Sequence, residues 1–197
     1  MLETIIIILL IMFIIIYKFK YKLNIKSVDA FNNISYIVND LPDAQEASDT
    51  LSNIMIRINK LIDNIIIDYD KGNKNKEDDN YIEYIRVIKD RLPYVRISEN
   101  PIDSKYTSYS VNKGEELVFC IRDRKKYKIH PLNELIYVAI HEIAHIGCPE
   151  VGHTDIFQSI NIYLLKKAIH YNLYMYIDYS KYNKKYCGMI LTSTIIK

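Results

Sequence analysis

Three histidines and one glutamate stand at a spacing that can bind a metal ion and use it. His141, Glu142 and His145 form a His-Glu-x-x-His motif, and His153 follows eight positions after the second histidine. Residues four apart lie on one face of a helix, so two such imidazoles can bind one zinc ion. Glu142 is then placed to act as general base toward a water molecule at the metal. We therefore expect a zinc site with catalytic potential.

The segment after the motif indicates how a third ligand could reach the metal. Gly147 falls where a helix C-terminus favours a left-handed residue. Pro149 and Gly152 favour a sharp turn, which would bring His153 back toward the helical pair. Other side chains of this segment could take the place of that ligand, namely Cys148, Glu150 and Asp155.

The motif requires a buried helix, and the sequence predicts one. Residues 132–140, before the motif, are apolar on most faces. A longer amphipathic helix is expected where apolar residues recur at steps of three and four over 44–65. That stripe either packs on its own domain or forms the seam of a homodimer. Another helix is expected over 81–92, stopped by Pro93.

Two β-rich runs, 107–111 and 116–121, flank a glycine-containing turn and predict a hairpin. A short closing strand is expected within 187–191. An extended peptide could pair with a strand edge beside the metal helix, although the hairpin could equally serve only to cover the core. The expected fold class is α+β, mostly helical with a small β-hairpin or sheet.

An unbroken apolar run from Ile5 to Ile16 occupies the N-terminus. With its flanks it makes about 24 Å of helix, and lysines follow it. We expect a transmembrane helix over 1–19, with a signal peptide or a core helix as alternatives. The positive-inside rule then predicts a single-pass membrane protein whose C-terminal domain is cytosolic. The other expected parts are a tether over 20–42, a catalytic domain over 43–191 and a tail over 192–197.

Charge and cysteine content narrow the function classes. A net charge of +2 gives no strong signal for nucleic-acid binding. Cys120, Cys148 and Cys187 are an odd and sparse set, which indicates free thiols and a reducing compartment rather than a disulfide framework. We expect Cys148 to be a small buried thiol.

The segment from Ala139 to Phe157 resembles the zincin metallopeptidases and looks most like their WLM and SprT-like branches. In those branches a histidine with an aromatic residue four positions later supplies the third ligand, and His153 and Phe157 match this feature. The spacing departs from the pattern, because seven residues separate His145 from His153 where WLM proteins usually have five. The Met-turn of metzincins is also missing.

Further segments are similar to small WLM-like proteins of large DNA viruses, a group generally regarded as zinc metallopeptidases. These segments are 104–115, 118–122, 178–180 and Tyr186-Cys187-Gly188. The resemblance covers about residues 42–191 and implies a zincin-like domain that hydrolyses protein or peptide substrates. The expected N-terminal helix would attach this domain to a host or virion membrane. The resemblance also implies Glu142 as catalytic base and Zn²⁺ bound by His141, His145 and His153. The alternative is an inactive zincin-like protein, stabilised by zinc, that serves as a membrane or virion interaction module.

Overall fold

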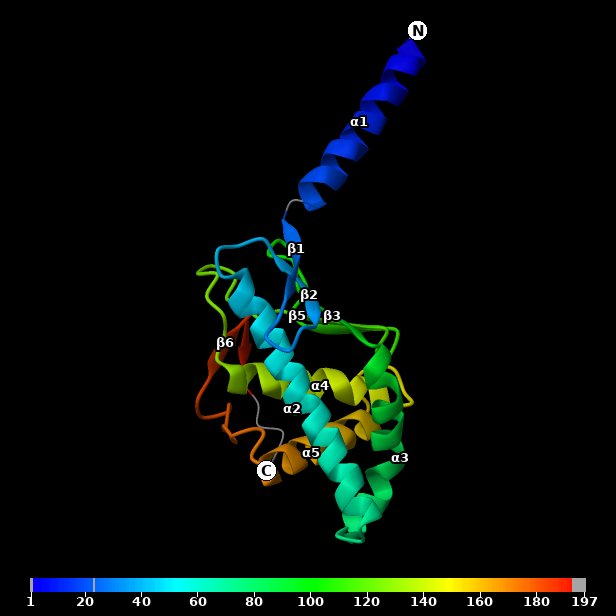
Figure 1. Cartoon of the computed structure of the whole chain (residues 1–197), viewed down its shortest axis with the longest axis vertical. Coiled ribbons are helices and arrows are strands. Elements are labelled where there is room, and N and C mark those ends of the chain that lie inside the picture. The colour runs from blue at the N-terminus through cyan, green and yellow to red at the C-terminus, as the bar shows by residue number, and fades with distance from the viewer. Residues whose placement is uncertain (1, 23, 193–197) are drawn as a thin grey trace.

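The computed structural model describes residues 2–22 and 24–192 (Figure 1). The helices in this part of the chain are α1 (Leu2–Lys22), α2 (Ala44–Asp70), α3 (Lys76–Arg91), the 3-10 helix η1 (Leu92–Tyr94), α4 (Leu132–Gly147) and α5 (Asp155–His170). The strands are β1 (Ile25–Asp29), β2 (Ser35–Asn39), β3 (Arg96–Glu99), β4 (Tyr109–Val111), β5 (Glu116–Phe119), β6 (Lys184–Tyr186) and β7 (Met189–Leu191). This is a mixed α+β fold, as expected.

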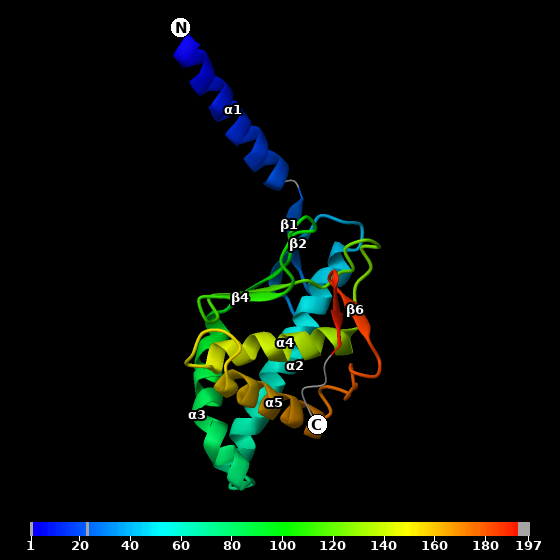
Figure 2. The same cartoon turned by 180° about the vertical axis from the view of Figure 1, so that it is seen from behind.

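Five strands form one sheet in the order β1-β2-β3-β5-β4. The pairs β1–β2 and β4–β5 are antiparallel, whereas β3 runs parallel to both of its neighbours. The hairpin expected around residues 112–114 is confirmed as β4 and β5. Strand β4 is last in the sheet order and runs close to α4, the helix that carries the His-Glu-x-x-His motif (Figure 2).

The long helix expected over 44–65 is confirmed as α2, and its apolar stripe lies inside the chain's own core. Its stripe residues are each no more than 3% exposed, and they are Ala44, Ala47, Leu51, Ile54, Ile58, Leu61 and Ile65. They pack among the helices α3, α4 and α5 and the sheet. The homodimer seam considered for this helix therefore finds no support.

Helix α1 projects away from the rest of the chain (Figure 1). Its side chains over Ile5–Ile16 are exposed. Among the described residues, however, no helix has both the length and the apolar character needed to cross a membrane. The unbroken apolar run has only twelve residues, whereas a spanning helix needs about 20. The transmembrane helix expected over 1–19 is therefore wrong, and so is the single-pass membrane location with a cytosolic domain.

The segment assigned to a tether, 20–42, contains strands β1 and β2. These two strands form a hairpin, and β2 continues the sheet by pairing with β3. Tyr36 and Val38 project from β2 into the core and are 4% and 0% exposed. This segment is thus part of the folded domain. Of the tail expected over 192–197, residues 193–197 lie outside the described part of the chain.

Cys120 and Cys187 form a disulfide with their Cα atoms 6.2 Å apart, while Cys148 is a buried free thiol. The expectation for Cys148 is confirmed, but free thiols at the other two positions are not found. The bonded residues are 67 positions apart in the sequence, and their meeting depends on the tertiary fold. The inference of a reducing compartment loses its basis.

Candidate metal centre

Helix α4 presents the His-Glu-x-x-His motif from the middle of the molecule, packed against α2, α3 and α5. Its last residue is Gly147, where an added Cβ would lie 2.8 Å from the backbone oxygen of Tyr84 in α3. Gly147 thus permits close approach of the two helices. The left-handed cap expected there is wrong, because the helix ends in extended backbone at Cys148 (φ −72°, ψ 127°).

The loop between α4 and α5 returns the third histidine to the motif. Gly152 adopts a left-handed conformation (φ 87°), as the predicted turn requires. The next helix is capped by Thr154, whose Oγ1 accepts a hydrogen bond from the Phe157 N–H at 3.4 Å. His153 directly precedes this cap, so the start of α5 determines where its imidazole lies.

The structure brings the three predicted ligands together. One nitrogen atom from each of His141, His145 and His153 lies within 4.8 Å of the others. The Nε2 atoms of His141 and His153 are 3.0 Å apart. Two nitrogen ligands on a tetrahedral zinc ion lie about 3.4 Å apart, so this spacing suits one ion. In the part of the chain that the structure describes, Cys148, Glu150 and Asp155 do not join the group.

Phe157 packs against all three imidazoles. Its ring stacks on His145 at a centroid distance of 4.1 Å and lies 4.9 Å from each of the other two. The Phe157 side chain is fully buried. It therefore restricts the orientation of the three rings and keeps water away from one side of the cluster.

The protonation states of the helical histidines suit a metal site. Burial, and after it the neighbouring histidines, lowers the pKa of His141 to about 4. Burial and the charge of His153 lower the pKa of His145 to about 4 as well. Both imidazoles are neutral at pH 7, and a neutral imidazole has a lone pair available for a cation. Nitrogen donors in this number and spacing fit zinc.

Glu142 lies on the same helix and is 6% exposed. Burial raises the pKa of its carboxyl group to about 7. A group with this pKa can both accept and release a proton near neutral pH, which is the property needed in a general base. The side chain faces the same cleft as the three histidines.

That cleft has a volume of about 860 Å³. Its walls are α4, the segment 107–113 around β4, the loop 150–153 and the hairpin of β6 and β7. The edge strand and the three clustered histidines thus share one open space. Room of this size beside a strand edge admits an extended peptide.

Two residues of the cleft were not identified from the sequence. The Tyr186 hydroxyl hydrogen-bonds with Ser108 Oγ at 2.7 Å, and Ser108 Oγ accepts the Cys120 N–H at 3.0 Å. Tyr186 is one of 18 tyrosines. The resemblance to viral proteins included Tyr186-Cys187-Gly188 but gave Tyr186 no role, and only a foreseen disulfide at Cys187 could have placed this tyrosine in the cleft.

No family model matches the chain. Two solved structures of Wss1 from Saccharomyces cerevisiae, one of them a mutant, align with 49% and 50% of this chain and 86% and 84% of theirs. Their TM-scores are 0.35 and 0.36 and their identities 17% and 20%. Similarity this low supports no conclusion about fold or function.

Three viral proteins are similar in sequence. Uncharacterized proteins 136R of Invertebrate iridescent virus 6 and 042R of Invertebrate iridescent virus 3 are 36% and 39% identical over 95 and 83 residues. These matches cover 47% and 42% of this chain and about half of each relative, 49% and 50%. Uncharacterized protein R325 of Acanthamoeba polyphaga mimivirus is 40% identical over 165 residues, or 84% of this chain and 81% of R325. The chain therefore belongs to the same family as the mimivirus protein R325.

Proposed function

We propose that this chain is a zinc-dependent metallopeptidase of the His-Glu-x-x-His type. The observation that supports it is the convergence of three imidazoles and a buried carboxyl group in one open cleft. His141, His145 and His153 would bind the zinc ion. A structural zinc site has four protein ligands, whereas the group found in the described residues has three and faces a cleft.

Zinc, when bound, would polarise a substrate carbonyl group and acidify a water molecule. Glu142, whose pKa of about 7 lets it both accept and release a proton, would serve as the general base toward the attacking water and as the proton donor to the leaving amine. Strand β4 orients the substrate, because an extended peptide can add to the sheet edge that lines the cleft. The substrate class is therefore an extended segment of a protein or peptide.

The first test is metal analysis of the full-length chain. We expect one zinc ion per wild-type chain and its loss from His153→Ala. The matched control is His170→Ala, because His170 is exposed at the end of α5 and lies outside the cluster. Wild-type protein that binds no zinc after purification in its presence would refute the proposal.

The second test separates catalysis from metal binding. Glu142→Gln should retain zinc and lose hydrolysis of an unfolded protein such as casein by a factor of at least about 10². Glu83→Gln, on the exposed face of α3, is the matched control. An active Glu142→Gln variant would refute the role of Glu142. Zinc binding without hydrolysis in the wild type would favour the alternative, an inactive zinc-stabilised interaction protein.

A further inference from the structure

The hairpin of β6 and β7 forms one wall of the cleft, although it is not part of the main sheet. Its two strands pair with each other as a separate two-stranded sheet. Tyr186, Met189 and Leu191 of this hairpin line the cleft. A two-stranded hairpin is marginally stable by itself, so its position depends on its attachment to the rest of the chain.

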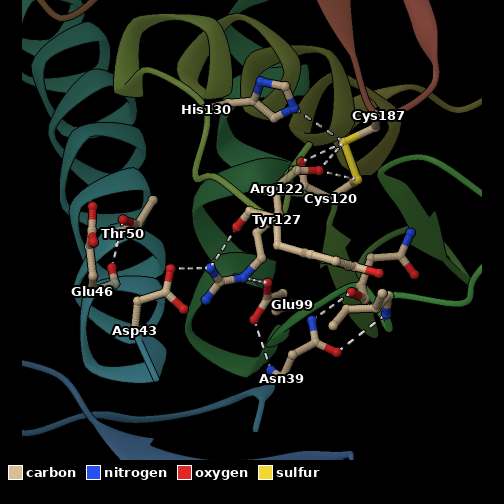
Figure 3. Close-up of polar contacts among 12 residues, drawn as sticks. Asn39, Asp43, Glu46, Thr50, Glu99, Cys120, Arg122, Tyr127, His130 and Cys187 are labelled. Carbon is tan, nitrogen blue, oxygen red and sulfur yellow. Dashed lines mark hydrogen bonds and ion pairs between the residues drawn. A yellow bond between two sulfur atoms is a disulfide. The ribbon is translucent and has the colours of Figure 1, made fainter. Parts of the chain in front are cut away.

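One attachment is covalent. Cys187 lies in the turn of the hairpin with φ 48°, and its disulfide to Cys120 joins that turn to the residue directly after β5 (Figure 3). Both cysteines are buried, at 1% and 6% exposure. The disulfide therefore connects the hairpin to the same β4–β5 region that forms another wall of the cleft.

Tyr186 provides the adjacent noncovalent attachment. It is 1% exposed, its hydroxyl contacts Ser108 Oγ, and its ring lies 5.1 Å from the ring of His130. Burial raises the pKa of the Tyr186 phenol, although its hydrogen bond with Ser108 lowers it and the charge of Glu142 adds to the rise. Tyr186 and Glu142 both line the cleft, so this attached side chain borders the same space as the proposed general base.

A weaker link is the ion pair between Lys184 Nζ and Glu134 Oε1 at 3.5 Å. The Lys184 side chain is 48% exposed, so solvent screens this pair and it adds little. The disulfide and the buried Tyr186 side chain are therefore the attachments expected to determine where the hairpin lies.

We propose that the Cys120–Cys187 disulfide positions Tyr186 and the cleft wall that it belongs to, so that substrate binding depends on the oxidised state of this pair. A dithiol reductant would supply two electrons and two protons. The sulfur–sulfur bond breaks, both cysteines become thiols, and the dithiol closes to its own disulfide. The proposal rests on the proposed peptidase function for its substrate, but not for the movement of the wall.

The metal cluster should not respond to this change. Its ligands come from α4 and from the loop before α5, and neither segment contains a cysteine of the disulfide. Tyr186 therefore acts as a positioning residue. We expect KM for a peptide to rise about tenfold when the disulfide is lost, because a tenfold change is about what the loss of one well-placed contact with a substrate produces. The change in kcat should be smaller.

The test uses the full-length, zinc-loaded protein in three forms: oxidised, treated with dithiothreitol, and Cys120→Ala/Cys187→Ala. The double variant represents the open state even if the buried disulfide resists the reductant. Cys148→Ala is the matched control, because Cys148 is a buried cysteine outside the disulfide and does not line the cleft. The first readout is amide hydrogen exchange, which reports local opening.

Amides of residues 184–191 should exchange at least about tenfold faster in the double variant, while those of α4 and the zinc content stay unchanged. The Cys148→Ala control should match the wild type. Unchanged exchange in the hairpin of the double variant would overturn the proposal, as would loss of zinc, since the disulfide would then act on the whole fold. If no form hydrolyses peptides, the peptidase function fails while the exchange result still decides the positioning role.

Discussion

Removing the Arg122 side chain should destabilise the fold more than most single substitutions, because it leaves a buried charge without its partner. Arg122 is 4% exposed, and its Nε donates to Glu99 Oε1 at 2.6 Å (Figure 3). Its Nη1 donates to the Asp43 carboxylate and to the Tyr127 carbonyl oxygen. The other oxygen of Glu99 accepts the Asn39 N–H at 2.8 Å.

The size of the expected loss of stability follows from how exposed each acidic partner of Arg122 is. The Glu99 side chain is 1% exposed, and loss of one partner of such a buried pair costs about 3–5 kcal/mol. The Asp43 side chain is 37% exposed, so its contribution should be below about 1 kcal/mol. For a chain of this length, Arg122→Met should lower Tm by roughly 6–20 °C.

The assay is urea unfolding of the full-length chain, followed by circular dichroism. Asp43→Asn is the matched control, and its free energy of unfolding should stay close to that of the wild type. The double variant Glu99→Gln/Arg122→Met should be more stable than Arg122→Met, because a neutral amide can still accept the Asn39 N–H. If Arg122→Met lies within about 1 kcal/mol of the wild type, or the double variant is the less stable of the two, the reasoning is refuted.

Three further substitutions and one treatment test other parts of the fold. Burial alone would raise the pKa of Asp78, but hydrogen bonds from Lys167, the Asn75 backbone and Tyr163 lower it below its ordinary 3.8. The stability that this lowered pKa contributes is fully present above the unfolded value of 3.8 and is lost as the pH falls through the pKa of the folded state. Asp78→Asn should therefore flatten the acid limb of a curve of unfolding free energy against pH. Gly147→Ala should destabilise by about 1–3 kcal/mol in thermal melts, because its Cβ would meet the backbone of α3. Leu51→Glu should unfold the chain in circular dichroism rather than dissociate a dimer in light scattering, since Leu51 is fully buried. A chelator should lower Tm of the zinc-loaded protein, and an unchanged Tm would argue against a bound ion. If free zinc stood at 100 times Kd before the chelator was added, the free energy of unfolding should fall by about 2.7 kcal/mol.

Local patterns in the sequence were sufficient to predict those elements whose structure depends on residues close together along the chain. The stripe from Ala44 to Ile65 and the His-Glu-x-x-His spacing are helical periodicities, and both elements form as predicted. The turn at Gly152 and the cap at Thr154 also use residues a few positions apart.

Features that depend on distant pairing could not be predicted in this way. Strand β3 pairs in parallel with β2 and β5, and its four residues show no distinctive pattern. The disulfide joins residues 67 positions apart, and Tyr186 reaches the cleft only through that fold. Hydropathy alone was misleading at Ile5–Ile16, where a short apolar run indicated a membrane span.

The attachment of His153 to the start of α5 bears on how relatives of this chain can be found. Because the N-cap of α5 fixes the position of His153, the loop before it can change in length without moving the imidazole. Val151 is 86% exposed and an added Cβ at Gly152 would meet no atom within 4 Å, so the loop has room for insertions. A search pattern with a fixed gap between the second and third histidines would overlook such proteins. A pattern that places the third histidine directly before a Thr-capped helix, with an aromatic residue four positions on, would retain them.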